Sequence, residues 1–491
     1  MDYTYTGVMP LSSPTSRGNH FTSQFEGDRS GTDLEYGVEM IYPLANTLGD
    51  KLTINVHGSN MHWRQQGTTF EMLTGGSGAL LSSADWRVNN PSLHRNDLTA
   101  SAHYLHTYTR TQGIFELDYS YQREAEDEER CLQAMRLTNF NAFAQSRLLT
   151  DALTQRHKVR AHRVLVKQAH TFGWGARYEN QLITAGDRQW LDQAQTLDDH
   201  FRHALHTAAA FAEYWWRCTK GLDLHASLEY DYTHMEGRHL HDYIPHVSIN
   251  YRPATSQDLS LSYSRRIIRP TLSLLNPARI RGSYTLDYGN PDLIGTHANT
   301  FELRYLYKPA SAQVSATLRH MRADDGFNAI WMERDGIRQS TWQNEGVRRA
   351  WSLTGNARWT MAKRTTLQAE AEVMWDKRIA EAIHMENAHW GGKVGAALRQ
   401  QFAHNIWASV DCNYSQGYTL DLYSHTGRTL RYGAEVGKSF LRERRLTATL
   451  SYHHCHYPDI VLTQGAYVGS LFQRSTSGHQ AQVQLAYRFG K

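Results

Sequence analysis

Apolar residues occupy every second position along most of the chain. In the segment 221–232, GLDLHASLEYDY, leucine, alanine and tyrosine residues alternate with aspartate, histidine, serine and glutamate. The segments 301–307, 367–375, 446–452 and 483–489 repeat the pattern. Because successive side chains of a β-strand point to opposite faces, this period of two predicts strands with one apolar and one polar face.

The number and length of these segments favour a membrane barrel over a soluble sheet. About 20 segments of roughly 9 to 14 residues alternate in this way, and a tilted strand needs about 9 to 11 residues to cross a bilayer. Strands of soluble sandwiches are usually shorter. We therefore predict an all-β fold, an antiparallel transmembrane β-barrel whose apolar faces contact lipid and whose polar faces line the lumen.

The predicted connections between strands alternate between short and long. Short connections are expected at 43–50, 217–221, 252–257, 307–311 and 361–365, and long ones at 62–94, 125–153, 183–202, 269–299, 415–427 and 457–477. Outer-membrane barrels have short periplasmic turns and longer outer loops. The segment from Arg123 to Leu153 has an acidic run and a helical composition, so it is expected to be an outer loop with a helical turn.

The two faces of the predicted strands lead to different expectations. The outward aromatic residues should form girdles at the membrane interfaces; they are Trp174, Tyr178, Trp351, Trp359, Trp375 and Tyr452. The charged residues of the opposite face should line the lumen, in contact with solvent, a solute or a plug. These are Asp223, Glu229, Glu302, Arg304, Glu370, Glu372 and Arg445.

The bulk composition excludes several other classes of protein. The chain has 491 residues and a net charge of +4, which is small for a dedicated nucleic-acid binder. No run of 18 apolar residues is present, so a helical membrane protein is excluded. The four cysteines form no CxxC pair and indicate neither a zinc site nor a disulfide framework.

A pair of motifs resembles a known family of outer-membrane proteins. The segment YSRRIIRPTLSLLNP at 263–277 is followed by YGNPDL at 288–293. The motif residues are Ser264, Arg265, Arg266, Arg269, Pro270, Leu275, Asn276 and Pro277, then Gly289, Asn290, Pro291 and Leu293. This pattern resembles the barrel of TonB-dependent receptors, the outer membrane beta-barrel protein family of Gram-negative bacteria. Residues 294–296 are Ile-Gly-Thr, where the family usually has Lys-Pro-Glu.

The resemblance implies an integral protein of the cell outer membrane with about 22 strands, an even number as in other such barrels. It also implies an upstream signal peptide, a TonB-binding segment and a plug domain, none of which is recognisable here. We therefore expect residues 1–30 to be an N-terminal linker or partial strand region and residues 31–491 to be the barrel. The chain is expected to be the C-terminal part of a longer receptor.

The motif also has a physical interpretation. Pro270 has no N–H and ends ladder pairing where the strand leaves the membrane. Asn290-Pro291 stiffens the loop, and Gly289 would tolerate a positive φ. Two hypotheses remain open: the loop is a rigid turn without a binding role, or one of Arg265, Arg266 and Arg269 contacts a ligand.

Two clusters of histidine are candidates for metal binding. In HHCH at 453–456, His454 and His456 share one face of a strand, which supplies fewer ligands than a zinc site uses. His239, His241 and His246 form a second cluster. The alternative for both clusters is a polar role at the membrane interface or in the lumen. No metal and no other cofactor is predicted.

No catalytic motif is present, since GxSxG, HExxH and P-loop patterns are all missing from the sequence, and the chain is not predicted to be an enzyme. The last strand alternates to Tyr487 and Phe489, which resembles the signal read by the barrel-assembly machinery. The expected partners are that machinery and outer-membrane lipid. No nucleic acid is expected to bind.

The resemblance implies TonB-dependent uptake of a scarce nutrient, an unknown small solute. The TonB complex would act only through the upstream segments, and a surface lipoprotein is a further possible partner. The alternative is a plugless outer-membrane pore, an adhesin platform or a non-functional barrel remnant.

Overall fold

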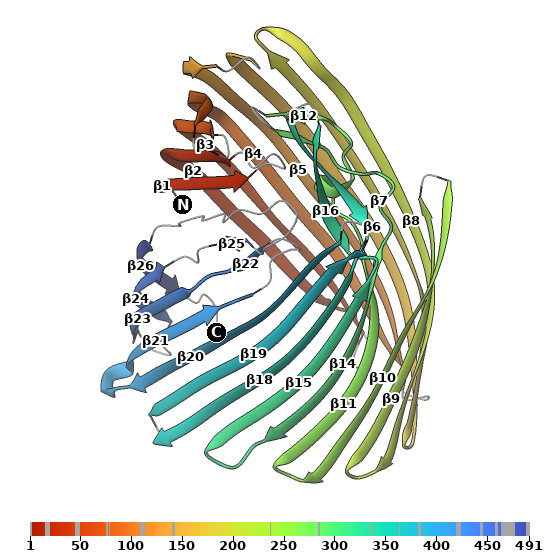
Figure 1. Ribbon diagram of the computed structural model, residues 1–491. Helices are drawn as coiled ribbons and strands as arrows, with labels where there is room; N and C mark the ends of the chain where they lie inside the picture. Colours follow the sequence, from red (N-terminus) through yellow and green to blue (C-terminus); the bar gives the residue numbers. More distant parts are fainter. Residues whose placement is uncertain are drawn as a thin grey trace.

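The computed structural model shows one large, strongly curved antiparallel sheet with a small sheet inside its concave side (Figure 1). It describes residues 2–14, 20–44, 50–74, 77, 79–108, 113–139, 143–235, 237–282, 285–334, 337–362, 364–381, 384–418, 424–441, 445–456, 460–462 and 477–487. Within these ranges the main sheet has 20 strands. This confirms the predicted antiparallel β-barrel type of fold and agrees with the roughly 20 alternating segments, whereas the resemblance implies about 22.

The main sheet is a meander in which each strand pairs antiparallel with the next one. Its strands are β1 (Asp2–Pro14), β2 (His20–Pro43), β3 (Lys51–Thr74), β4 (Leu80–Tyr108), β5 (Gly113–Thr138), β6 (Gln145–Lys167), β7 (His170–Leu191), β8 (Ala194–Thr219), β9 (Leu222–Met235), β10 (Arg238–Ala254), β11 (Gln257–Ile268), β14 (Thr296–Tyr307), β15 (Ala312–Asp324), β18 (Val347–Ala362), β19 (Thr365–Ala380), β20 (Met385–Gln401), β21 (Ile406–Gln416), β23 (Thr429–Phe440), β24 (Leu446–His456) and β26 (Ser477–Tyr487). β1 and β26 form its two edges.

The N-terminal region, expected to be a linker or partial strand, contains β1 and the start of β2. The two strands pair from Asp2 opposite Thr32 to Pro14 opposite His20. β2 in turn pairs with β3 along its whole length, from His20 opposite Thr74 to Pro43 opposite Lys51. These residues therefore extend the same sheet.

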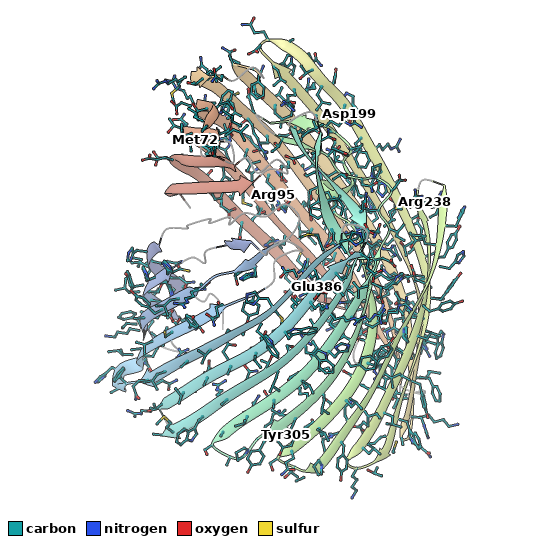
Figure 2. All side chains as sticks on the ribbon, viewed as in Figure 1. Met72, Arg95, Asp199, Arg238, Tyr305 and Glu386 are labelled. Atoms are coloured by element: carbon teal, nitrogen blue, oxygen red, sulfur yellow. The ribbon has the colours of Figure 1, made fainter. Side chains whose placement is uncertain are left out.

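Strand β14 shows the division between lipid and lumen faces. Phe301, Leu303 and Tyr305 remain 52%, 42% and 41% exposed, although they are large and apolar. The alternate residue Glu302 forms an ion pair with Arg319 of β15 at 2.7 Å. Figure 2 places Tyr305 near the end of the sheet where the short turns lie. The apolar face is thus turned outward, as predicted for contact with lipid.

Aromatic side chains line up across neighbouring strands on this outward face. Trp351 of β18 lies directly opposite His320 of β15 on one side and Trp375 of β19 on the other. Trp375 lies opposite Trp390 of β20, which is 65% exposed. This row is the kind of girdle expected where a barrel meets the lipid headgroups, and it contains two of the predicted girdle residues.

The long strands β3 to β8 extend well beyond the apolar band, and this corrects the sequence analysis. The predicted long loops at 62–94, 125–153 and 183–202 are wrong, because most of those residues belong to paired strands. β4 alone has 29 residues, which at ~3.3 Å per residue gives roughly 95 Å, far more than a tilted strand needs to cross a bilayer.

In the segment from Arg123 to Leu153, the residues up to Thr138 and from Gln145 onward are strand rather than helix. They form the outer half of β5 and the first part of β6, with Glu126 opposite Ala152 in the ladder. The tip that joins them is tied to the neighbouring hairpin, since Asp192 Oδ1 accepts hydrogen bonds from the backbone N–H groups of Ala144 and Gln145 at 2.7 and 2.8 Å. Outside the membrane both faces of a strand are in contact with water. The alternation of apolar and polar residues is therefore lost there, although the backbone pairing between strands continues.

The connections at 269–295 and 325–346 fold into the lumen. The first contains α1 (Leu272–Leu275), β12 (Ile280–Arg281) and β13 (Thr285–Asp287), and the second is the hairpin β16 (Phe327–Arg334) and β17 (Ile337–Asn344). Together the four strands form a small sheet in the order β12-β13-β17-β16. In Figure 1 this sheet lies inside the curve of the main sheet, in front of β5 to β7.

The remaining elements lie in connections of the main sheet. β22 (Ser424–Thr426) pairs with β25 (Ile460–Leu462), which joins two connections on the same end of the sheet. A single 3-10 turn, η2 (Ala403–Asn405), links β20 to β21. Among the described residues, no helix has the length and hydropathy needed to cross a membrane.

Candidate functional site

The loop between β11 and β14 is anchored to the inner wall by a small hydrophobic core. Leu275 and Leu293, both motif residues, are 1% and 0% exposed. They pack against Ile183 and Ala185 of β7 and Phe201 of β8. Because an apolar cluster inside a polar lumen removes these side chains from water, it holds the loop against this part of the wall.

Polar contacts fix the same loop to β7. Asn276 Nδ2 donates a hydrogen bond to Asp187 Oδ2 at 2.6 Å, and Thr150 Oγ1 donates to Asp187 Oδ1 at 2.8 Å. Two strand positions further, the Gln189 side chain donates to the backbone carbonyl of Arg281 and accepts from its backbone N–H, at 2.7 and 3.0 Å. Asp187 and Gln189 are 1% and 2% exposed, so these bonds are shielded from water.

The motif glycine allows two parts of the loop to approach each other. The backbone N–H of Gly289 donates to the carbonyl of Asn276 at 2.6 Å, and that of Asn290 donates to Leu274 at 2.7 Å. A Cβ atom at position 289 would lie 2.5 Å from the Asn276 oxygen. The tolerance of Gly289 for a positive φ is not used, because Gly237, Gly346 and Gly417 are the described glycines with that conformation. The glycine is needed for close approach instead.

The loop is also bonded to the β16–β17 hairpin. Asn290 Nδ2 donates to the carbonyl of Trp342 at 2.8 Å. The Asn344 side chain accepts from the backbone N–H of Ile294 at 2.7 Å and donates to its carbonyl at 2.9 Å. The two inward-folded connections therefore form one unit.

Arg269 links the start of the loop to a buried ion-pair network on β7 and β9. Its Nη2 donates to Thr233 Oγ1 at 2.9 Å and lies 3.6 Å from Asp231 Oδ2. Asp231 is also paired with Arg177 at 3.0 Å, and Arg177 with Glu229 at 2.5 Å. Burial lowers the pKa of the Arg269 guanidinium, while the charges of Asp231 and its acidic neighbours oppose this shift.

A cavity of about 640 Å³ separates the loop from the inner face of β4 to β7. Its charged lining residues are Arg95, Glu124, Glu126, Glu128, Arg130, Arg156, Asp187, Arg269 and Asp287. Figure 2 marks Arg95 on β4. Dense groups of both signs can bind a hydrophilic solute through charge-assisted hydrogen bonds. We take this cavity as the candidate functional site.

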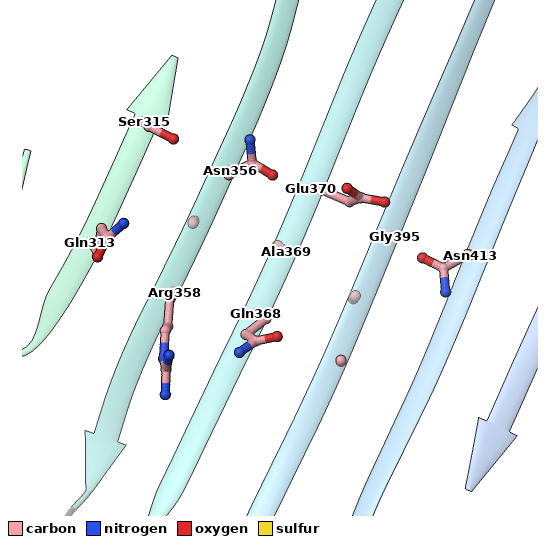
Figure 3. Close-up of a pocket in the computed structure, with 12 residues that line it drawn as sticks. Gln313, Ser315, Asn356, Arg358, Gln368, Ala369, Glu370, Gly395 and Asn413 are labelled. Atoms are coloured by element: carbon pink, nitrogen blue, oxygen red, sulfur yellow. The ribbon is translucent and has the colours of Figure 1, made fainter. Parts of the chain in front are cut away.

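A second cavity of about 280 Å³ lies on the inner wall of β15 to β21 (Figure 3). Its polar lining consists of Gln313, Ser315, Asn356, Arg358, Gln368, Glu370 and Asn413. Gly395 leaves the space open, since a Cβ atom there would lie 2.2 Å from Asn413 Oδ1. This hollow is lined mainly by amide and hydroxyl groups, in contrast to the charged first cavity.

The structure separates the motif residues into two groups. Arg269, Pro270, Asn276 and Gly289 line the larger cavity. Ser264, Arg265 and Arg266 lie in β11 instead, opposite Thr300, Asn299 and Ala298 of β14. Only Arg269 of the three motif arginines thus lies where the ligand-contact hypothesis would place it.

The remaining motif residues have structural positions within the loop. The carbonyl of Asn290 accepts a hydrogen bond from the backbone N–H of Leu293 at 3.3 Å, so the turn spans Pro291. Pro277 directly follows Asn276, whose Oδ1 accepts from the backbone N–H of Ala278 at 3.2 Å. The rigid turn and the cavity wall are therefore built from the same segment.

The charged residues predicted to face the lumen are mostly engaged with neighbouring side chains. Glu370 pairs with Lys393 at 3.1 Å, and Asp223 with Arg217 at 3.5 Å. Glu372 accepts hydrogen bonds from Thr354 and from the hydroxyl of Tyr418, both at 3.5 Å. Asp223 also pairs with Arg252. These contacts join side chains of neighbouring strands on the inner wall of the barrel.

The candidate metal ligands do not form a larger cluster. His454 faces His479 of β26, with their Nδ1 atoms 3.3 Å apart, whereas His456 lies opposite Ser477. His246 has its ring 5.1 Å from that of His225, away from His239 and His241. Within the described part of the chain, no group of three or more His, Cys, Asp or Glu residues is arranged to hold a metal ion.

The predicted assembly signal is described only in part. Tyr487 ends β26 opposite Leu446 and is 47% exposed. Phe489 lies outside the described residues.

Sequence reasoning missed Asp187, Gln189 and Asn344, which carry the contacts that hold the loop in place. Asp187 and Gln189 alternate with Gly186 and Arg188 in a segment that was expected to be a loop, so no strand face was assigned to them. Asn344 is the last residue of the β16–β17 hairpin, whose inward direction has no local signal. Their roles depend on contacts across 89, 92 and 50 residues of sequence.

The chain matches known outer-membrane proteins in sequence and in fold. Residues 106–455 match the model of the Outer membrane protein beta-barrel family. The fold is similar to that of the ferric yersiniabactin uptake receptor FyuA from Yersinia pestis, with a TM-score of 0.59, 11% identity, and coverage of 99% of this chain and 80% of that one.

Two further solved structures give similar values. The copper transporter OprC has a TM-score of 0.59 at 11% identity, covering 99% of this chain and 83% of that one. The FrpB iron transporter from Neisseria meningitidis has a TM-score of 0.56 at 11% identity, covering 99% and 82%. No curated protein matches the sequence.

Proposed function

Because this chain belongs to the Outer membrane protein beta-barrel family, we propose that it forms the barrel of a receptor that takes up a scarce solute by TonB-dependent transport. It is an integral protein of the outer membrane. The barrel supplies the wall and part of the binding site, and no chemical step. Energy from the TonB complex would reach it through segments other than the barrel, as the motif resemblance implies.

The observation that carries the proposal is the charged cavity beneath the inward-folded loop. A passive pore needs an open lumen, whereas here the 269–295 loop is tied to the wall by hydrogen bonds at Asp187 and Gln189, and the β16–β17 hairpin is bonded to that loop. The loop and wall border a partly open cavity of about 640 Å³ that is lined by residues of both charges. Such a site suits a compact, hydrophilic, multiply charged solute.

Similar folds support metal-containing solutes as the first compounds to test. The structures of similar fold include receptors or transporters of a ferric siderophore, copper and iron. A metal chelate offers both anionic oxygens for Arg95, Arg130 and Arg269 and polar donors for the carboxylates. We propose the same class of solute here. The barrel-assembly machinery, lipid and a surface lipoprotein remain the proposed partners.

Direct binding tests this proposal. The purified protein would be titrated with a panel of ferric siderophores and copper complexes, with tryptophan fluorescence as the readout. We expect saturable binding of at least one compound, weakened by Arg130→Ala, a cavity substitution. Arg358→Ala, in the second cavity, is the matched control. A panel without binding, or equal binding by both variants, would contradict the assignment of the cavity.

A further inference from the structure

Among the described residues, the outward face of the barrel carries five exposed tyrosine–histidine pairs with a shared geometry. In each pair the tyrosine hydroxyl lies within hydrogen-bonding distance of Nδ1 of a histidine on the neighbouring strand, and each pair is exposed. The Tyr–His pairs are Tyr119–His157 (3.1 Å), Tyr178–His206 (3.0 Å), Tyr230–His241 (2.7 Å), Tyr232–His239 (2.6 Å) and Tyr452–His479 (2.6 Å). They occur on β5 to β10 and again on β24 and β26, so the arrangement recurs in two separate parts of the sheet. A sixth pair, His170–Tyr214 at 2.7 Å, is half-buried at the short-turn end of β7 and β8 and is not part of this group.

The Tyr–His pairs lie at the outer margin of the apolar band. Each histidine is roughly 8 to 15 residues from the short-turn end of its strand, which for a strand rising ~3.3 Å per residue at a tilt near 45° corresponds to ~20 to 35 Å of height. The apolar band of such barrels is about 25 Å tall. The histidines therefore lie between the outer part of the apolar band and the layer of lipid headgroups above it.

Three histidines lie side by side in this layer. His234 of β9 is directly opposite His206 of β8 and also directly opposite His239 of β10. The rings of His234 and His239 are 4.8 Å apart. Three imidazole rings therefore lie next to one another on the outward face of β8 to β10.

The pairing determines which ring nitrogen is available to an external partner. When a tyrosine O–H donates to Nδ1 of a neutral histidine, the ring proton is on Nε2. No hydrogen bond reaches Nε2 of these five histidines from any residue that the structure describes. Each pair can therefore donate an Nε2–H bond to a group outside the protein.

The charges around the Tyr–His pairs favour an anionic partner. Along the strands, the outward neighbours of the histidines are uncharged, such as Val159, Ala204 and Ala208, and Arg123 follows Tyr119 and Tyr121 on the outward face. Near the pairs, the acidic residues of these strands lie on the other face; Asp127, Glu129, Asp151 and Asp198 share the outward face but lie further out, beyond the pairs. They pair there with inner-wall side chains: Asp118 with His103, Glu229 and Asp231 with Arg177, and Asp242 with His297.

We propose that the Tyr–His pairs bind the phosphate groups of lipid headgroups in the outer leaflet, with each Nε2–H donating to a phosphate oxygen. The groups that face the histidines are their tyrosine partners and, between β8 and β10, the neighbouring histidines. His479 also faces His454, with their Nδ1 atoms 3.3 Å apart, and the ring of Tyr121 lies 4.8 Å from that of His157. Protonation of a histidine keeps Nε2–H and adds a positive charge, which strengthens the bond to phosphate. This surface is separate from the lumen cavity and independent of the transported solute.

Lipid retention in native mass spectrometry tests this proposal. The purified full chain would be placed in detergent with equal amounts of dioleoyl phosphatidic acid and dioleoylglycerol, which differ only in the phosphate. We expect retention of phosphatidic acid over dioleoylglycerol by about tenfold or more, the size expected from one or two charge-assisted hydrogen bonds. Equal retention of the two lipids by the wild-type chain would overturn the proposal.

A double variant tests whether phosphatidic acid binds at the Tyr–His pairs. His206→Phe with His239→Phe keeps an aromatic ring but removes two Nε2–H donors, and we expect most of the preference to be lost. The matched control, His57→Phe with His200→Phe, changes two histidines outside the pairs and should keep it. A folded H206F/H239F variant, checked by heat-dependent mobility in a gel, that retains the full preference would contradict the proposal. If that variant does not fold, the comparison of the two lipids on the wild-type chain still tests the proposal, because equal retention would overturn it.

Discussion

Asn276 donates a 2.6 Å hydrogen bond to Asp187, and this contact joins the inward-folded loop to β7 across 89 residues of sequence. Asp187 is 1% exposed and has a second donor in Thr150. A buried carboxylate without these donors would lose solvation and hydrogen bonding together. The contact is therefore one of the anchors that hold the loop against the wall, together with the core at Leu275 and the bonds to Gln189.

The substitution Asn276→Ala should release the loop. Removing one donor from a buried carboxylate costs about 1 to 3 kcal/mol, so we expect faster amide hydrogen exchange in residues 269–295 with little change in the transmembrane strands. Asn60→Ala, at an exposed position of β3, is the control and should leave exchange unchanged. Unaltered exchange in N276A would show that the bond does not hold the loop.

The substitution Gly289→Ala should distort the 269–295 loop, because the added Cβ atom would clash with backbone atoms. Its Cβ atom would lie 2.5 Å from the Asn276 oxygen and 2.7 Å from the Leu274 oxygen, both backbone atoms. We expect a loss of about 2 kcal/mol or more in the free energy of urea unfolding, within the range for severe local clashes. Gly355→Ala is the matched control, because a Cβ atom at position 355 would lie 3.9 Å from its nearest neighbouring atom. Equal stability of the two variants would contradict the close-approach role.

The substitution Leu293→Ala should open a cavity in the core beneath the loop. Leu293 is fully buried among Leu275, Ile183 and Phe201, and a large-to-small change at such a site costs about 2 to 5 kcal/mol. Leu137→Ala, on the outer part of β5, removes the same atoms from a side chain that is 36% exposed and should cost much less. Urea unfolding of both variants measures the difference. A small loss for L293A would mean that the loop is not packed as described.

A charge on the lipid face should be far more costly than a charge on the lumen face. Leu353 is 49% exposed on the outward side of β18, and its neighbour Thr354 donates to Glu372 on the inner side. Leu353→Arg should destabilise the barrel by about 2 to 4 kcal/mol, and less if the position is close to the interface. Thr354→Arg can pair with Glu372 and should be tolerated. Refolding into lipid vesicles from urea measures both. A reversed order would mean that the two faces are assigned incorrectly.

The sequence predicts the membrane-crossing part of the fold because each strand there has one face in lipid and one in the lumen. This difference produces the alternation of apolar and polar residues. Phe301, Leu303 and Tyr305 must face lipid while Glu302 must not, and this requirement is visible without any contact information. The outer half of β5 faces water on both sides, so nothing in its composition distinguishes a strand from a loop or a helix. This half of β5 is a strand because its backbone pairs with β6, and that pairing leaves no alternating pattern in the sequence.

The candidate site is harder to predict, because its residues come from distant segments. The motif identifies Asn276 and Gly289, but not the wall positions that they contact. Asp187 has no local feature that marks it, and its role follows only from the inward direction of the loop. The hairpin β16–β17 was not predicted either, since a short hairpin in the lumen needs no lipid-facing stripe.

Solute uptake by living cells tests the central claim most directly. In the bacterium that encodes this chain, uptake of a labelled solute found in the binding panel would be compared between the parent, a deletion strain and the parent treated with a protonophore. The account predicts saturable uptake that is lost on deletion and also lost when the proton gradient collapses, because TonB-dependent transport needs that energy. Uptake that depends on the gene but persists with the protonophore would contradict it and identify a passive pore.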